Sequence, residues 1–407
     1  MTSTTKHPLP SHFILPDLLD QWPFETEPNP HQEIVDDSAR WVESYKAFSP
    51  KAQDAFNRCN FGIFASLAYP RSEGTHYRAA CDLMNLFFVF DEFSDAENGD
   101  VVRQQAADIM NALRYPDKIP AGGDSILGAM TRDYWKRTLE VSSKSSAERF
   151  IRNFDGYTDA VRQEAVDRDE GRERSIEEYM ELRRGTIGVY PSFDYFLLED
   201  DIPDEYIDHP AVASLALGAV DMTILANDVY SWNVEQCRGE DRHNLVAVAM
   251  REKGLSVQEA MDYVGTIYAG IRDKYVKEFN ELPQFPEKYD KLVKDYCWHM
   301  GNWVTTNIKW SHFGERYFGK KGREILKHRT VEVMRPSVLG HTSKDSGILS
   351  LVRSSKVPNR RASKIGMSSE NERFEACATE TRVLGETAKG YWAEEAARKA
   401  ACGLLER

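Results

Sequence analysis

Residues 212–235 read VASLALGAVDMTILANDVYSWNVE and contain the longest apolar run of the chain. The first part of this stretch, up to Ala226, is mostly apolar, whereas oxygen-bearing side chains recur every four residues from Asn227 onward. A long apolar run without the strict alternation of a half-exposed strand predicts a helix. Because a helix this apolar must be buried, the stretch predicts a core helix of an all-α bundle.

Most of the remaining chain also has the apolar period of helices. We predict further helices over residues 50–67, 77–93, 101–113, 147–164, 176–189, 257–279 and 289–307. Ser49 can cap the first of these, and Pro50 suits its first position. Alternating Val, Ile and Thr runs joined by Asn-Gly turns are lacking, which argues against a β-rich or βαβ fold.

The composition excludes several classes of protein. The 407 residues include 65 acidic and 52 basic ones, for a net charge of −13, which disfavours binding to nucleic acid or to anionic membranes. The sequence contains no GxxxxGK[ST], GxGxxG or HExxH motif, so a nucleotide-binding enzyme or a zinc protease is disfavoured.

The sequence predicts a cytoplasmic protein. Six cysteines form no CxxC pair and are too few for a disulfide scaffold, which favours a reducing compartment. Residues 1–22 lack the continuous apolar region of a signal peptide. The longest apolar run, residues 212–220, is shorter than the ~20 residues of a spanning helix, so we expect no transmembrane segment.

The composition changes near residue 335, and this predicts the domain organisation. Residues 354–371 are polar with little to bury. We therefore predict one domain over residues 1–334, followed by a weakly basic, partly disordered tail over residues 335–407. Within that tail, residues 392–405 could form one isolated helix.

The first acidic cluster is DEFSD at residues 91–95, directly after an aromatic run. Asp91 and Asp95 are four residues apart and share one face of a helix. Placing them beside phenylalanines is costly unless a positive charge lies near, and Mg²⁺ favours such oxygen ligands. The alternative is a helix end that enters solvent. An EF-hand fails on spacing, because Ala96 stands where that loop needs glycine.

The second cluster lies within the opening stretch. Asn227, Ser231 and Glu235 recur at intervals of four and line one helix face. An amide oxygen, a hydroxyl and a carboxylate stacked in this way predict a second Mg²⁺ site. A polar stripe on a partly exposed helix is the alternative.

Two cationic segments accompany these clusters. Arg183 and Arg184 follow each other on a predicted helix, and the pair Arg316-Tyr317 lies among aromatic residues. Arginine matches phosphate oxygens with two parallel hydrogen bonds. Each segment alone is better explained as a structural ion pair, but two Mg²⁺-type clusters with arginine donors describe a diphosphate site above an apolar cavity.

In this combination the sequence resembles the class I terpene cyclases, specifically the fungal sesquiterpene synthases of the basidiomycete type. Residues 91–95 match the motif D(D/E)xx(D/E), residues 227–235 match the motif (N/D)D(L/I/V)x(S/T)xxxE at every position, and Arg316-Tyr317 matches the RY pair. The resemblance covers about residues 12–334 and implies a class I terpenoid synthase bundle around an apolar cavity.

The resemblance also implies the chemistry and its residues. The substrate would be a prenyl diphosphate, most simply farnesyl diphosphate, bound with three Mg²⁺ ions by a monomer or homodimer. The implied metal ligands are Asp91, Asp95, Asn227, Ser231 and Glu235. Arg184, four residues before Gly188, would be the diphosphate sensor, acting with Arg316 and Tyr317.

One position departs from the family. Many members carry Lys immediately before the motif's glutamate, whereas this chain has Val234. A contact to the diphosphate from that position must therefore come from another residue, and Arg238 is a candidate. Aromatic faces can stabilise carbocations. Core packing is the alternative role for each of the candidate cavity aromatics, which are Phe61, Phe64, Phe87, Phe88, Tyr190 and Trp310.

Two other functions compete. A trans-prenyl diphosphate synthase would carry a second acidic cluster, and DDIPD at residues 200–204 matches it literally. Pro203 is unsuited to a helix interior, so we predict an acidic loop there instead. A non-catalytic helical scaffold is the remaining alternative.

Overall fold

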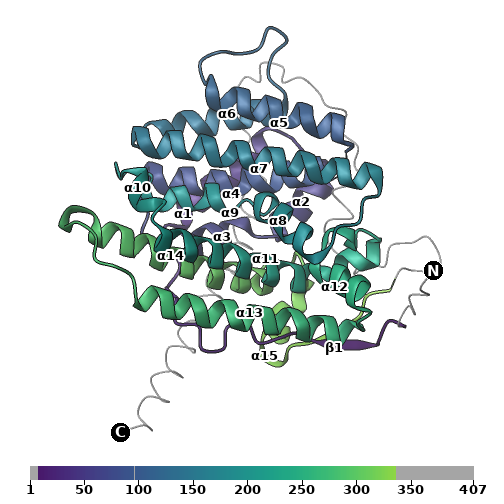
Figure 1. Cartoon of the computed structure of the whole chain (residues 1–407). Coiled ribbons are helices and arrows are strands. Elements are labelled where there is room, and N and C mark those ends of the chain that lie inside the picture. Colours follow the sequence, from purple (N-terminus) through teal and green to yellow (C-terminus); the bar gives the residue numbers. More distant parts are fainter. Residues whose placement is uncertain (1–7, 96, 336–407) are drawn as a thin grey trace.

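The computed structural model describes residues 8–95 and 97–335, and almost all regular structure within them is helical (Figure 1). In chain order the elements are β1 (His12–Ile14), α1 (Gln32–Ser44), α2 (Pro50–Arg58), α3 (Phe61–Ala68), α4 (Gly74–Ser94), α5 (Gly99–Arg114), α6 (Ile126–Leu139), α7 (Lys144–Glu170), α8 (Ile176–Thr186), α9 (Val189–Phe193), η1 (Asp194–Leu197), α10 (Asp204–Ile207), α11 (Pro210–Arg238), η2 (Asp241–His243), α12 (Leu245–Lys253), α13 (Val257–Asn280), α14 (Glu287–Phe313), η3 (Gly319–Lys321), α15 (Gly322–His328) and β2 (Thr330–Glu332).

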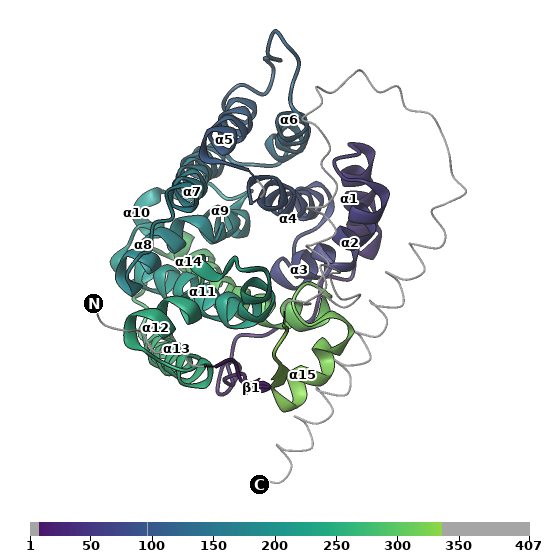
Figure 2. The same cartoon turned by 90° about the vertical axis from the view of Figure 1, so that its right-hand side faces the viewer.

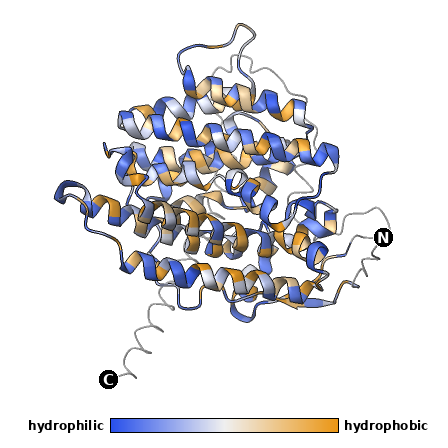
Figure 3. Cartoon of the chain, in the orientation of Figure 1, coloured by the Kyte–Doolittle hydropathy of each residue, from blue (hydrophilic) through white to orange (hydrophobic). Residues whose placement is uncertain are grey.

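The long helices run side by side, and Figure 2 views several of them nearly end-on. Helix α11 packs most extensively against α13 and α14, while α5 packs against α6 and α7. Figure 3 shows apolar residues along α11 and α14 and hydrophilic residues on the outer turns of the surrounding helices. The predicted all-α bundle is therefore confirmed.

Helix α11 is longer and more apolar overall than its run at residues 212–220 indicates. Among the described residues it is the one helix long and apolar enough to cross a membrane by length and composition, and 72% of its apolar window is buried inside the protein. A helix buried on most sides is expected to be apolar around its circumference. Its packing in the core therefore accounts for its composition.

Two predicted helices are each divided in the structure. The helix predicted over residues 50–67 breaks at Asn60, whose φ of 54° is left-handed and whose side chain caps α3 by accepting from Ile63 N. The helix predicted over residues 176–189 ends at Thr186, and Gly188 with φ of 69° starts α9. Asn and Gly tolerate this conformation better than other residues. The cap of α2 is confirmed, because Ser49 accepts from Ala52 N.

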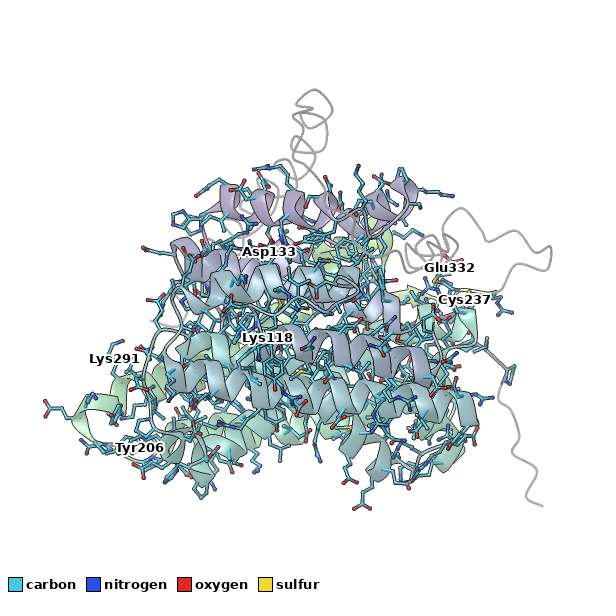
Figure 4. The ribbon with its side chains drawn as sticks, turned by 90° about the horizontal axis from the view of Figure 1, so that it is seen from above. Lys118, Asp133, Tyr206, Cys237, Lys291 and Glu332 are labelled. Atoms are coloured by element: carbon cyan, nitrogen blue, oxygen red, sulfur yellow. The ribbon has the colours of Figure 1, made fainter. Side chains whose placement is uncertain are left out.

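Several elements were not predicted from the sequence, namely α1, α6, α10, α12, α15 and the β1–β2 pair. The two strands are antiparallel, with Phe13 opposite Val331. Phe13 lies edge-on to Trp232 of α11, with ring centroids 5.4 Å apart. Figure 4 shows Glu332 of β2 beside Cys237 near the end of α11. The first and last described segments therefore meet against the same helix.

The side chain of Asn233 fastens β2 to α11. Its Nδ2 donates to Glu332 O at 2.9 Å, and its Oδ1 accepts from Met334 N at 2.9 Å. Gln236 Nε2 also donates to Met334 O at 2.7 Å. The predictions for residues 336–407, including the isolated helix, fall outside the described residues.

The N-terminal segment crosses α14 at a glycine. Trp22 Nε1 donates to Gly301 O at 3.1 Å, and a Cβ atom at Gly301 would come within 2.5 Å of the Phe24 ring. The ring is buried against Tyr275 and Phe279, so it has little room to retreat. Position 301 therefore requires a residue without a side chain.

We predict that Gly301→Ala lowers the free energy of unfolding by about 1–3 kcal/mol, as overpacking of a filled core does. Gly270→Ala is the matched control, because Gly270 lies at an exposed position of α13 and a Cβ atom added there would meet nothing within 4 Å. That change should add up to ~1 kcal/mol through helix propensity. Urea unfolding of both variants measures the difference, and equal effects would contradict the close approach of Phe24.

Candidate active site

A cavity of about 480 Å³ lies between α4, α7, α8, α11 and α14. This is within the ~300–1,000 Å³ of ordinary small-molecule sites. Its wall includes seven of the eight predicted site residues, among them all five predicted metal ligands. These are Asp91, Asp95, Asn227, Ser231, Glu235, Arg316 and Tyr317. The structure thus brings residues from both acidic clusters and the Arg-Tyr pair to one cavity.

Helix α4 presents the first acidic cluster at its C-terminal end. Arg316 donates from NH2 to Asp91 Oδ2 at 2.7 Å and from NH1 to Glu92 Oε1 at 3.1 Å. The Asp91 side chain is 40% exposed and that of Glu92 only 2%. Asp91 therefore faces the cavity, and Asp95 caps the helix beside it. Glu92 lies behind them as a buried counter-charge for Arg316.

Helix α11 carries the second cluster. Asn227 Oδ1 accepts from Arg183 NH2 at 2.9 Å, and its Nδ2 donates to Tyr317 OH at 3.0 Å. Burial and, to a smaller extent, the neighbouring Asp228 carboxylate raise the pKa of the Glu235 carboxyl to about 8. A negative charge at Glu235 is therefore unfavourable unless a cation lies beside it.

The donor set fits a hard divalent cation. Asn227, Ser231 and Glu235 offer one amide oxygen, one hydroxyl and one carboxylate, and Asp91 and Asp95 offer two more carboxylates across the cavity. Within residues 8–95 and 97–335 no three His, Cys, Asp or Glu side chains form a metal-binding group. An ion here must therefore combine carboxylates with neutral oxygens and with oxygens of a bound ligand, as Mg²⁺ commonly does.

Of the two adjacent arginines, Arg183 lines the cavity, whereas Arg184, the predicted diphosphate sensor, does not. Arg184 instead makes a two-point ion pair with Asp221, from Nε at 2.7 Å and NH2 at 2.9 Å. Neighbouring residues of a helix point about 100° apart, so one of the pair turns inward and the other outward. Spacing to Gly188 alone did not indicate which one.

Sequence reasoning missed a buried network beneath the second cluster. Asp228 Oδ2 accepts from Tyr179 OH at 2.5 Å and from Leu245 N at 2.9 Å, and Arg183 Nε lies 3.5 Å from its Oδ1. Burial raises the pKa of Asp228, while Arg183 opposes that shift. Asp228 therefore supports the helix junction rather than the cavity. The sequence signal for this role was that Asp228 directly follows Asn227. It therefore points about 100° away from the helix face that carries the second cluster.

Four of the six candidate aromatics line the cavity, namely Phe64, Phe87, Phe88 and Trp310. Phe61 lies behind this wall and stacks on Phe88, with ring centroids 3.8 Å apart, and Tyr190 is also outside the lining. Trp303 lines the cavity and was not predicted. The guanidinium of Arg316 lies 5.2 Å from the Phe88 ring centroid, where the polar and aromatic parts of the wall meet.

The acidic segment at residues 200–204 lies away from the cavity. Pro203 immediately precedes the short helix α10, as its restricted backbone predicts. Asp204 pairs with Arg149 at 2.9 Å and with Arg152 at 2.6 Å, and Asp201 accepts from Ser145. None of these acids lines the cavity. The prediction that this motif is an acidic loop rather than a metal site agrees with their placement.

Comparison with known proteins identifies the family. Residues 82–274 match the sequence model of terpene synthase family 2, C-terminal metal binding. A delta(6)-protoilludene synthase of Stereum hirsutum is 44% identical over 340 residues, which cover 82% of this chain and 92% of that protein. Another from Armillaria gallica is 41% identical over 322 residues, covering 79% and 93%. Sesquiterpene synthase 9 of Postia placenta is 38% identical, covering 83% and 98%.

Solved structures agree in fold. Germacradien-4-ol synthase from Streptomyces citricolor superposes with a TM-score of 0.61 at 22% identity, covering 71% of this chain and 96% of that one. Hedycaryol synthase in complex with nerolidol gives 0.63 at 19% identity, covering 73% and 100%. The chain therefore belongs to the terpene synthase family and is a terpene cyclase related to the sesquiterpene synthases of basidiomycete fungi.

Proposed function

We propose that this terpene cyclase is a Mg²⁺-dependent sesquiterpene synthase that ionises farnesyl diphosphate and cyclises the resulting allylic cation. One observation carries the proposal: Asp91 and Asp95 share a single cavity with Asn227, Ser231 and Glu235, and aromatic side chains line part of its wall. The names of the relatives support a sesquiterpene product. The five ligands would hold the ions, and three ions follow from the family resemblance.

The polar wall would bind the diphosphate group. Mg²⁺, when bound, neutralises charge on the leaving oxygens. The C–O bond breaks, its electron pair stays on the departing diphosphate, and Arg183, Arg316 and Tyr317 donate hydrogen bonds to that group. Arg183 donates to the amide oxygen of Asn227, and Arg316 pairs with the carboxylate of Asp91. Both arginines therefore lie within reach of a diphosphate bound at this wall.

The aromatic wall would hold the hydrocarbon chain. Phe64, Phe87, Phe88 and Trp310 present ring faces or edges to the cavity and exclude water from the cation. Cation–π attraction stabilises positive charge that moves along the chain during cyclisation. Loss of a proton or capture of water then ends the reaction.

The competing functions have less support. A trans-prenyl diphosphate synthase needs a second aspartate cluster at the cavity, whereas Asp204 is paired with arginines elsewhere. The predictions of a catalytic domain over residues 1–334 and of a cytoplasmic protein stand as part of the proposal. The four cysteines of the described residues, Cys59, Cys81, Cys237 and Cys297, are free thiols, which suits a reducing compartment.

We expect the purified protein to convert farnesyl diphosphate to a cyclic C15 product with Mg²⁺ and not with EDTA, as measured by headspace mass spectrometry. Glu235→Gln should lower kcat/KM about 100-fold or more, because one charged ligand oxygen is lost. Glu287→Gln, at the exposed start of α14, is the control and should match the wild type. Turnover of the wild type in EDTA would contradict the proposal.

The two adjacent arginines give a second prediction. Arg183→Gln should lower kcat/KM with farnesyl diphosphate about 100-fold by removing a donor to the leaving group, whereas Arg184→Gln should cost less than tenfold because Arg184 pairs with Asp221 outside the cavity. Inhibition by inorganic diphosphate should weaken in parallel for Arg183→Gln only. The reverse ranking would restore Arg184 as the diphosphate sensor.

A further inference from the structure

Asn244 is a fully buried polar residue with no role in the proposed reaction so far. It lies between η2 and α12 in an extended conformation, with φ of −146° and ψ of 128°, and its relative exposure is 0%. The segment around Asn244 packs against the C-terminal half of α11. The backbone N–H of the next residue, Leu245, donates to Asp228 Oδ2 at 2.9 Å. The Asn244 side chain is therefore held between two helices.

Both ends of the Asn244 amide are engaged. Its Oδ1 accepts from Val246 N at 2.9 Å and so caps α12. Its Nδ2 lies 2.9 Å from Asp228 O, 3.2 Å from Ser231 Oγ and 2.9 Å from Glu235 Oε2. Two of these three acceptors belong to proposed metal ligands. Few single side chains could reach the backbone and two side chains of one helix in this way.

Capping alone does not require asparagine here. Ser, Thr and Asp cap helices about as well, but none of them supplies a second group of N–H donors. The donors point at the Ser231 hydroxyl and at the Glu235 carboxylate, which is shielded from solvent beside α12. Hydrogen-bond donation to a carboxylate both lowers the cost of burying its charge and fixes the carboxylate's orientation.

We propose that Asn244 is a positioning residue that orients Ser231 Oγ and Glu235 Oε2 so that both can bind one divalent cation. The inference rests on the proposed function and adds to it a residue outside the matched motif. An amide nitrogen has two hydrogens and faces three acceptors here, and the contact to Ser231 is the longest.

The test is Asn244→Ser, which keeps a capping oxygen for α12 and removes the amide donors. Asn98→Ser is the matched control, because Asn98 caps α5 in the same manner by accepting from Asp100 N and Val101 N at an exposed site. Titration calorimetry with Mg²⁺ in the presence of inorganic diphosphate measures binding without turnover. The KM for Mg²⁺ and kcat with farnesyl diphosphate are measured alongside.

We expect Asn244→Ser to weaken Mg²⁺ binding about 10–100-fold, as loss of groups that orient metal ligands typically does, and Asn98→Ser to leave it unchanged. Adding Asn244→Ser to Glu235→Gln should weaken binding by less than it does in the wild type, because one of its targets is already altered. A purely structural role would lower the melting temperature and leave Mg²⁺ binding by the folded protein intact.

Two further outcomes distinguish a failure of the role of Asn244 from a failure of the proposed function. If Asn244→Ser does not fold, Asn244→Thr replaces it, since threonine keeps a capping oxygen and fills more of the space but lacks the amide donors. A folded variant of either kind that binds Mg²⁺ as tightly as the wild type overturns the role of Asn244. A wild-type protein that binds neither Mg²⁺ nor diphosphate overturns the proposed function itself.

Discussion

The site depends on the compensation of negative charge at the edge of an apolar cavity. Carboxylates are costly to bury unless cations or donors face them, and each acid here has such a partner. Arg316 faces Asp91 and Glu92, and Arg183 faces Asp228. Glu235 Oε2 accepts from the amide nitrogen of Asn244 at 2.9 Å. Burial raises the pKa of this carboxyl, so a bound cation would stabilise its negative charge.

These pairs join segments that are far apart in sequence. Arg316 follows α14 and reaches the end of α4, while Arg183 in α8 reaches α11. The charged contacts therefore connect α4, α8, α11 and the segment after α14 around one opening. The same groups that stabilise the polar wall are those that a diphosphate would contact, so binding would exchange one set of partners for another.

Much of this arrangement could be predicted from local patterns. Apolar periodicity gave the long helices, and intervals of four placed Asn227, Ser231 and Glu235 on one face. Local patterns did not reveal the breaks at Asn60 and Gly188, because each depends on a single residue with positive φ inside an otherwise helical run. Which of Arg183 and Arg184 faces the cavity depends on how α8 is rotated against α11, and tertiary packing sets that rotation. Asn244 lies outside every motif, and only the folded chain brings it to Ser231.

The β1–β2 pair brings the two ends of the described fold together, which would allow them to be joined in a circular permutant. Its register places His12 opposite Glu332, so the two ends of the described fold lie within the reach of a short linker. The turn between α5 and α6 contains the exposed residues Tyr115 and Ile119 and contributes nothing to the cavity wall. Chains tolerate new termini at exposed turns of this kind when the old ones are adjacent. A circular permutant that opens there would leave both acidic clusters on uninterrupted helices.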